Sequence, residues 1–311
     1  MNAHAPRSID EYLRQLRSEL AGQDPALIQD ALYDAEEYLR AEVAAHPGKS
    51  EADVLELIAS TYGDPAEVAA AYRDTEAKVR VALSPPTPSP AAPASPLRRF
   101  FRVYMDARAY TSLFYLLLTL ATGIVYFTFL VVGLSLSAGL AVLIIGIPFF
   151  LAFIGMTRVI ALGEGRLLEA MTGERMPRRP VHPGPPGPWG TRILEMLKDV
   201  RTWTTLLYFL LMLPLGIVYF TLSVVGLSVG LRLALAPFIF LGHEFDWLPW
   251  HLATEMIEFD GHEWPSPDTL LGAVCYLVLG VLILTVLMHA ARGIARGHAR
   301  LAKLLLVQPG G

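Results

Sequence analysis

One segment, residues 242–268, combines side chains that can bind a metal ion or a proton. It holds three histidines and seven carboxylates, with no lysine or arginine. Imidazole binds transition metals and titrates between about pH 5 and 8, and nearby carboxylates raise its pKa. The candidate residues for sensing protons or a divalent cation are His243, Glu244, Asp246, His251, His262 and Glu263.

The spacing of these residues matches no closed zinc motif, so we predict no metal centre and no cofactor. The alternative interpretation is an acidic loop with Trp247, Trp250 and Trp264 at the lipid interface. No nucleophile and base can be paired in the polar parts of the chain either. We therefore predict no catalytic residue and no enzymatic activity.

A second set of candidates comes from a block of six residues, Gly-Ile-Val-Tyr-Phe-Thr, which occurs at 123–128 and again at 216–221. Its hydroxyl groups lie in apolar surroundings, where an unbonded polar group is costly. One interpretation is a polar pocket for an amphipathic ligand. The other is a threonine that bonds its own helix and a tyrosine that packs across helices. The residues of this intramembrane motif are Gly123, Tyr126, Thr128, Gly216, Tyr219 and Thr221.

The two blocks lie in apolar runs that predict four membrane spans. No charged residue occurs from Ala109 to Thr157, which is too long for one span of about 20 residues. A helical hairpin is expected there, with its turn at Ser135–Gly139. Helices are expected because backbone polar groups must be bonded within lipid. The predicted spans are residues 109–135, 138–157, 202–229 and 269–288.

The placement of lysine and arginine predicts the orientation. The segments that flank the spans on one side hold 16 of these residues, whereas the other side holds only Arg232. Positive residues concentrate on the cytoplasmic side, so both termini are expected in the cytoplasm. The two copies would then run in the same direction, related by a pseudo-twofold axis along the membrane normal.

Residues 1–83 are polar and have the pattern of a small helical domain. Helix starts are indicated by Ser8, Asp24-Pro25, Ser50 and Asp64-Pro65, which are N-cap residues and first-turn prolines. Four amphipathic helices of this length can bury one small core. The segment carries 16 acidic and 8 basic side chains, which argues against direct binding of nucleic acid.

The predicted fold class is all-α. A small cytoplasmic four-helix domain precedes a four-transmembrane-helix domain that is built from two parallel tandem repeats of a helical hairpin. The predicted boundaries are 1–83 for the helical domain, 84–97 for a Pro-rich linker, 98–176 for the first membrane repeat, 177–190 for a Pro/Gly linker, and 191–307 for the second repeat with its insertion 242–268.

Three stretches resemble the HAAS family of small helical signalling domains: Ile9-Asp-Glu-Tyr-Leu-Arg-Gln-Leu16, Asp34-Ala-Glu-Glu-Tyr-Leu39 and Tyr62-Gly-Asp-Pro-Ala-Glu-Val-Ala69. The resemblance covers about residues 8–75. It implies protein interaction at the cytoplasmic amino terminus of a bacterial membrane protein, often in systems with PadR-like regulators. The candidate partner-binding residues are Tyr62, Gly63, Asp64, Pro65, Glu36 and Glu37.

The membrane half, at about residues 97–307, resembles the family called Putative sensor, which is seen in bacterial and especially actinobacterial membrane proteins and histidine kinases. The resemblance rests on Asp199-Val-Arg-Thr-Trp-Thr-Thr-Leu-Leu-Tyr208, Pro214-Leu-Gly-Ile-Val-Tyr-Phe-Thr221, Val225-Gly-Leu-Ser228 and Ile145-Gly-Ile-Pro148. Family members often continue into a kinase, whereas this chain ends at Gly311. We therefore expect a signal to leave through residues 1–83 or through a partner.

These patterns predict a non-enzymatic integral sensor of the bacterial inner membrane that relays an envelope or membrane condition to a cytoplasmic partner. The acidic helical domain is expected to dock on the basic cytoplasmic flank and to be released when the membrane helices rearrange. The expected partners are the lipid bilayer and a cytoplasmic protein, such as a PadR-like regulator or a kinase supplied in trans. The alternative function is a structural or accessory subunit of an export or envelope complex. The oligomeric state is left open, a homo-oligomer included.

Overall fold

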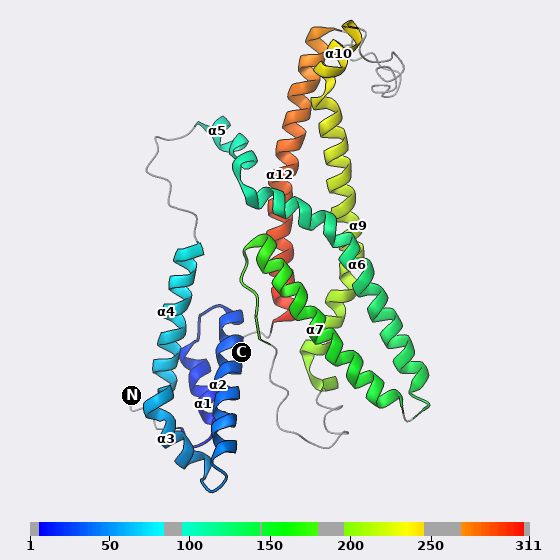
Figure 1. Cartoon of the computed structure of the whole chain (residues 1–311). Helices are drawn as coiled ribbons and strands as arrows, with labels where there is room; N and C mark the ends of the chain where they lie inside the picture. The colour runs from blue at the N-terminus through cyan, green and yellow to red at the C-terminus, as the bar shows by residue number, and fades with distance from the viewer. Residues whose placement is uncertain (1–5, 84–94, 144, 180–195, 246–268, 308–311) are drawn as a thin grey trace. The chain divides into compact units, whose positions relative to one another are not determined.

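The computed structural model describes residues 6–83, 95–143, 145–179, 196–245 and 269–307, and every element in these ranges is a helix (Figure 1). The predicted all-α class is confirmed. The chain divides into two compact units. Unit 1 comprises Met1–Ala92, Val132–Tyr208 and Arg300–Gly311, and unit 2 comprises Pro93–Val131 and Phe209–Ala299.

The amino-terminal domain, within unit 1, consists of the four helices that the capping residues predict. They are α1 (Ile9–Glu19), α2 (Pro25–Ala45), α3 (Glu51–Tyr62) and α4 (Pro65–Leu83). The side chains of Ser8, Asp24 and Ser50 each accept a hydrogen bond from a backbone N–H in the first turn of the helix that follows. Ser50 and Asp53 bond reciprocally in a capping box. Each helix start is therefore set by short-range bonds.

The core of this domain forms around α1, which packs against α2 and α4. The side chains of Leu16, Leu20 and Leu39 are fully buried in it. Ala31 and Ala35 on α2 are also fully buried, and their small side chains leave room for α1. Burying one leucine stabilises a fold by about 1.5–3 kcal/mol. Several such residues are enough to hold four short helices together.

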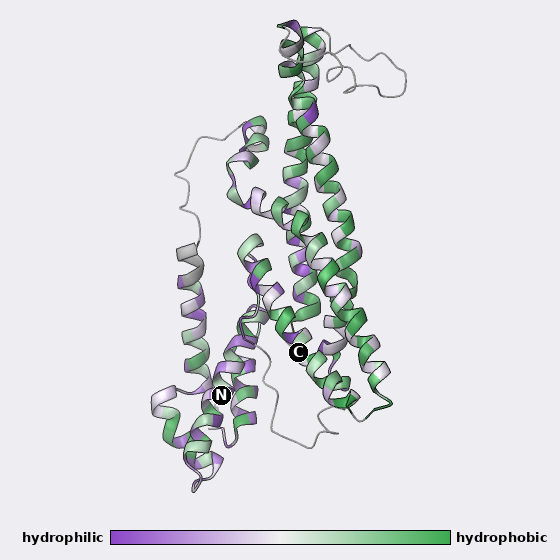
Figure 2. Ribbon diagram, turned by 45° about the vertical axis from the view of Figure 1, so that its right-hand side comes forward, coloured by the Kyte–Doolittle hydropathy of each residue, from purple (hydrophilic) through white to green (hydrophobic). Residues whose placement is uncertain are grey.

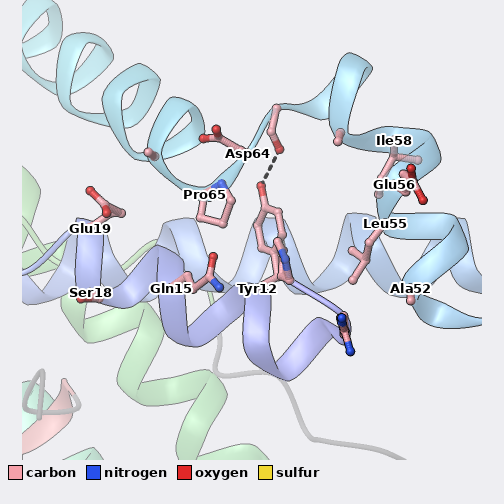
Figure 3. Close-up of a pocket in the computed structure, with 15 residues that line it drawn as sticks. Tyr12, Gln15, Ser18, Glu19, Ala52, Leu55, Glu56, Ile58, Asp64 and Pro65 are labelled. Atoms are coloured by element: carbon pink, nitrogen blue, oxygen red, sulfur yellow. Dashed lines mark hydrogen bonds between the residues drawn. The ribbon is translucent and has the colours of Figure 1, made fainter. Parts of the chain in front are cut away.

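The turn between α3 and α4 is held in one conformation by several contacts. Gly63 has a φ of 97°, in the left-handed region that glycine adopts without strain. The Tyr12 hydroxyl of α1 donates a hydrogen bond to the carbonyl oxygen of Gly63 at 2.9 Å (Figure 3). The Asp64 carboxylate accepts from the backbone N–H of Glu67 at 2.8 Å, and Pro65 begins α4. The Tyr-Gly-Asp-Pro stretch thus forms a fixed turn against α1.

Four further helices are long and apolar enough to cross a membrane, and Figure 2 shows apolar residues along their length. They are α6 (Ala107–Leu140), α7 (Gly146–Thr172), α9 (Val200–Ala234) and α12 (Leu270–Leu306). The shorter elements are α5 (Pro96–Phe101), the 3₁₀ helix η1 (Arg102–Met105) and α10 (Ala236–Glu244). The chain is a multi-pass membrane protein, as its apolar runs predict.

The helix ends differ from the predicted span ends. α6 continues through Ser135–Gly139, where we expected the turn. Polar side chains do not end a helix in apolar surroundings when they bond back to it, and the Ser137 hydroxyl donates to the carbonyl oxygen of Gly133 at 2.6 Å. α7 and α12 extend beyond the predicted ends to Thr172 and Leu306. Charged residues propagate a helix well, so the loss of hydropathy does not mark its end.

Within unit 2, α6 and α9 cross at the two glycines of the duplicated block. A Cβ atom added to Gly123 would lie 2.6 Å from the carbonyl oxygen of Met212, and one added to Gly216 would lie 2.6 Å from that of Thr119. Met212 and Thr119 hold equivalent positions in the two copies. The contact is therefore reciprocal, and only glycine allows so close an approach of two backbones.

The rings of Tyr126 and Phe209 make a third contact beside this crossing, with centroids 5.0 Å apart. Together the three contacts place the duplicated block where α6 and α9 cross. The common direction of the two copies across the membrane, which the lysine and arginine placement predicts, stays a prediction.

Candidate functional site

Charged groups gather where the amino-terminal domain contacts the chain that follows α7, within unit 1. α7 ends at Gly173, whose left-handed conformation (φ 76°) stops the helix and turns the chain. Basic residues from this segment, from α9 and from α12 contact polar groups of the amino-terminal domain. We call these residues the charged interface. Its members are Arg175, Arg178, Arg179, Arg201 and Lys303 on one side and Asp24, Gln29, Asp30, Asp34 and Glu76 on the other.

Asp30 of α2 lies at the centre of the charged interface. Its Oδ1 atom accepts hydrogen bonds from the backbone N–H groups of Arg178 and Arg179 at 2.9 and 3.0 Å. Its Oδ2 atom accepts from the Arg175 guanidinium at 3.1 Å, and the same guanidinium pairs with Glu76 of α4. The side chains of Arg175 and Asp30 are only 17% and 8% exposed. These groups are therefore bonded to one another in a site that is largely closed to water.

Burial raises the pKa of Asp30, and the bonds from the Arg179 and Arg178 backbone and the charge of Arg175 offset this only in part. The ionised carboxylate is thus held at a cost in desolvation. Because its pKa is raised in the contacted form, that form binds more protons than a form in which Asp30 is open to water. Lowering the pH through the raised pKa of Asp30 therefore favours the closed contact. Raising the pH through that pKa weakens the contact.

Two further contacts flank Asp30. Arg179 pairs with Asp34 through its Nε atom at 2.9 Å, and the Asp34 carboxylate also accepts from the Tyr72 hydroxyl at 3.0 Å. Burial, followed by this bond to Asp34, raises the pKa of Tyr72. The Gln29 amide donates to the carbonyl oxygen of Arg179 at 2.8 Å and accepts from the Arg201 guanidinium of α9 at 3.4 Å. The contact therefore involves both the segment after α7 and the start of α9.

The end of α12 reaches the same helix of the amino-terminal domain. The Lys303 ammonium donates to the Asp24 carboxylate at 2.6 Å, and Asp24 also caps α2 by accepting from the backbone N–H of Ala26. A carbodiimide joins such an amine and carboxylate directly. The Lys303–Asp24 crosslink therefore reports whether the charged interface is closed. The Lys78–Asp74 pair within α4, also at 2.6 Å, is an internal reference for the reagent.

The Asp30→Ala and Asp30→Asn variants should differ strongly in this crosslink. Asparagine retains an oxygen for the backbone N–H groups of Arg178 and Arg179, whereas alanine leaves both donors without an acceptor. Each buried unsatisfied donor costs about 1–3 kcal/mol. We expect Asp30→Ala to lower the Lys303–Asp24 yield, relative to Lys78–Asp74, by about tenfold or more, and Asp30→Asn by less than about threefold. Equal losses would show that the two backbone bonds do not hold the contact.

A pair of equivalent ion pairs links the two membrane copies. In unit 1, Arg158 of α7 pairs with Asp199 before α9 at 3.0 Å. In unit 2, Arg292 of α12 pairs with Asp106 before α6, also at 3.0 Å. The repeat aligns Arg158 with Arg292 and Asp106 with Asp199. Each pair thus ties the second helix of one copy to the start of the first helix of the other.

A second contact between the copies is found six residues further along α7 and α12. In unit 1 the Tyr208 hydroxyl donates to Glu164 at 3.1 Å, and both side chains are buried. In unit 2 the rings of Tyr115 and His298 lie 5.6 Å apart, and Tyr219 packs edge-on against His298 at 5.7 Å. Tyr115 aligns with Tyr208, and His298 stands where the first copy has Glu164. Both copies therefore have a contact at this position. It is a hydrogen bond to a carboxylate in unit 1 and a packing of aromatic rings in unit 2.

The residues of the intramembrane motif divide into two groups. Gly123 and Gly216 make the backbone contact, while Tyr126 and Tyr219 lie against Phe209 and His298. Thr128 and Thr221 are exposed on the helix surface. The glycine and tyrosine contacts pack helices together, while the role of the whole motif stays a prediction. The ligand pocket stays a prediction.

The predicted partner-binding residues fall at two places in the amino-terminal domain. Glu37 is exposed on α2, and Glu36 pairs with Arg40 at 2.8 Å on the same helix. The Tyr62 ring stacks on that of Tyr38, with centroids 4.3 Å apart. Gly63, Asp64 and Pro65 line a groove of about 720 Å³ between α1, α3 and the turn (Figure 3). Other residues along it include Glu19, Leu55, Glu56 and Ile58.

The predicted sensing residues lie mostly outside the described residues. His243 and Glu244 belong to the last turn of α10, and Glu244 is exposed. Asp246, His251, His262 and Glu263 fall in 246–268, which the structure does not describe. Among the residues it does describe, no three histidine, cysteine or carboxylate side chains are placed to hold a metal ion. Sensing by these six residues therefore stays a prediction.

Sequence reasoning expected the acidic domain to contact basic residues but did not single out Asp30, Asp34 or Glu164. Asp30 stands beside the buried Ala31 in an apolar stretch of α2, and Asp34 follows one helical turn later. A carboxylate in such a position needs a partner. Glu164 could have been found by extending the alignment of Arg158 with Arg292 along the two helices.

Comparison with known families is consistent with this organisation. A family model described as Putative sensor matches residues 115–306, and a model described as HAAS matches residues 11–71. Both predicted resemblances and their order along the chain are confirmed. Both are sensor or signalling families rather than enzyme families. No curated protein and no solved structure matches the chain.

Proposed function

Because the chain belongs to the Putative sensor family, we propose that it is a membrane sensor that reports a membrane or envelope condition to a cytoplasmic protein through its HAAS domain. It acts without catalysis, by changing which surface of the amino-terminal domain is available. The partner is a PadR-like regulator or a kinase supplied in trans. The protein resides in the bacterial inner membrane.

The charged interface is the observation that carries this proposal. It joins the amino-terminal domain to α9, to α12 and to the segment after α7 through ionic bonds rather than an apolar core. Such contacts form and separate more readily than apolar interfaces and weaken with salt. A small displacement of α7 or α9 moves Arg175 or Arg201 away from α2. The domain is then released.

Two contacts between the membrane copies, Arg158–Asp199 and Glu164–Tyr208, connect the membrane helices to these arginines. Arg158 and Glu164 couple α7 to the start of α9, and both helices lead into the charged interface. In this proposal a rearrangement of the membrane helices alters the two pairs and shifts Arg175 and Arg201 together. Coupling between the membrane helices and the amino-terminal domain needs a part of the protein that has two arrangements. In this proposal that part is the charged interface, which is either closed or open.

The partner docks on the groove between α1, α3 and the Tyr62–Pro65 turn. None of the residues that line the groove belongs to the charged interface. Its lining includes three acidic residues, Glu19, Glu56 and Asp64, one basic residue, Arg7, and the apolar residues Leu55 and Ile58. This combination fits a basic segment of the partner that carries an apolar anchor residue.

The orientation in this proposal follows the distribution of lysine and arginine, with both termini in the cytoplasm. The turn after α6 and the end of α10 then face outward. In a Cys275→Ser background, Val142→Cys and Glu244→Cys should both react in intact cells with a membrane-impermeant maleimide, since both positions are exposed. An Arg98→Cys control in α5 should react only after the cells are opened. Reaction at only one of the two outer sites would refute the common direction of the copies.

Partner capture in native membranes tests the function. We expect a regulator to crosslink to the full-length chain but not to a version that lacks residues 1–83, with a yield that changes under envelope stress, acid or added metal. Replacing His243, His251 and His262 by glutamine should abolish the response to acid or metal if they are the sensors. A constant, stoichiometric complex that forms with or without residues 1–83 would instead identify an accessory subunit.

A further inference from the structure

The three arginines that follow α7 lie close to the membrane surface. Arg201 comes directly before the predicted span 202–229 and donates to the Gln29 amide at 3.4 Å, and the same amide donates to the carbonyl oxygen of Arg179 at 2.8 Å. One side chain therefore joins the arginine segment to a residue at the edge of a span. Arg175, Arg178 and Arg179 come within seven residues of the helix end at Thr172. Phosphate groups of lipids are therefore within their reach.

The same guanidinium groups are held by carboxylates of the amino-terminal domain. Arg175 bonds Asp30 and Glu76 and is only 17% exposed, so it has no room for a second anion while the charged interface is closed. Arg178 and Arg179 are both 52% exposed, and they pair with Glu169 and Asp34. An anion from the membrane would therefore reach Arg178 and Arg179 first and Arg175 only after the interface has opened.

Phosphate and carboxylate compete for arginine by the same geometry. Guanidinium groups bind either anion through parallel N–H donors. Basic segments beside a membrane gain from each arginine when the leaflet contains anionic lipid. The side of the interface that would be vacated is acidic, because α2 and α4 contribute Asp30, Asp34 and Glu76. A negative leaflet therefore attracts the arginine segment and repels its present partner.

We propose that Arg175, Arg178 and Arg179 form a binding surface for anionic phospholipid headgroups, which competes with the amino-terminal domain for these arginines. The anionic lipid content of the membrane then sets the fraction of the domain that is released. This inference rests on the proposed function and names its stimulus. With three arginines, the ratio of open to closed protein can rise by up to about 100-fold.

The full-length protein in lipid nanodiscs provides the test. The Lys303–Asp24 crosslink is measured relative to Lys78–Asp74 in phosphatidylcholine alone and in equal parts of phosphatidylcholine and phosphatidylglycerol, at constant ionic strength. These headgroups contain neither the amine nor the carboxylate that the reagent joins. We expect the relative yield to fall at least about fivefold in the anionic discs. An unchanged yield would overturn the proposal.

Two variants separate lipid binding by these arginines from general repulsion of the acidic domain. Arg178→Gln/Arg179→Gln should lose most of the dependence on phosphatidylglycerol. Arg98→Gln/Arg102→Gln, which removes two exposed arginines from α5 and η1, should keep it. Equal dependence in both variants would refute the assigned surface.

The same experiment distinguishes this inference from the proposed function. A strong crosslink that ignores lipid composition would remove lipid as the stimulus and leave the closed interface in place. If the crosslink were absent even in phosphatidylcholine, the charged interface itself would not exist in a membrane, and both proposals would fail.

Discussion

The Arg175→Glu variant should lose nearly all of the Lys303–Asp24 crosslink and should capture the cytoplasmic partner independently of conditions. The new carboxylate would face Asp30 and Glu76 in a site where the native side chain is 17% exposed. Breaking a buried ion pair by removing one partner costs about 3–5 kcal/mol. That corresponds to a shift of roughly 150- to 4,000-fold toward the open form.

A second substitution and a matched control make this result interpretable. Adding Glu76→Arg to Arg175→Glu restores one pair of opposite charges and should recover part of the crosslink. Arg98→Glu makes the same charge change at an exposed position in α5 and should leave the crosslink unchanged. If Arg175→Glu retained the native yield, the charged interface would not hold the domain.

Gly123→Ala should destabilise the packing of α6 on α9 by about 2–3 kcal/mol. The added methyl group would lie 2.6 Å from the carbonyl oxygen of Met212, and a backbone atom cannot move aside as a side chain can. Gly216→Ala should have a similar effect, because its Cβ would meet the carbonyl oxygen of Thr119 at the same distance. The measurement is the free energy of unfolding, from titration of the detergent-solubilised protein with dodecyl sulfate and detection of helix content.

The control for these substitutions is Gly155→Ala in α7, where no atom lies within 4 Å of the added Cβ. Alanine favours a helix over glycine by up to about 1 kcal/mol, so this variant should be as stable as the native protein or slightly more stable. Similar stability of Gly123→Ala and Gly155→Ala would show that α6 and α9 do not meet at the duplicated block.

Prediction from sequence succeeded where the determining interactions are short in range. The starts of α1, α2 and α3 follow from Ser8, Asp24 and Ser50, whose side chains bond backbone groups two or three residues away. It was less accurate at the turn after α6, because serine and glycine at Ser135–Gly139 are compatible with either a turn or a continuous helix. In apolar surroundings, helical bonding prevailed.

The amino-acid sequence by itself determined the all-α class, the four apolar helices, the family membership and the opposite charges of the amino-terminal domain and the segments beside the spans. These properties depend on hydropathy, capping and charge along the chain. Tertiary structure alone decided that Arg175 bonds Asp30 and Glu76, that Glu164 meets Tyr208, and that Gly123 faces Met212. Such choices depend on which side chains approach within a few ångströms after packing, and residues far apart in the chain carry no local signal of that approach.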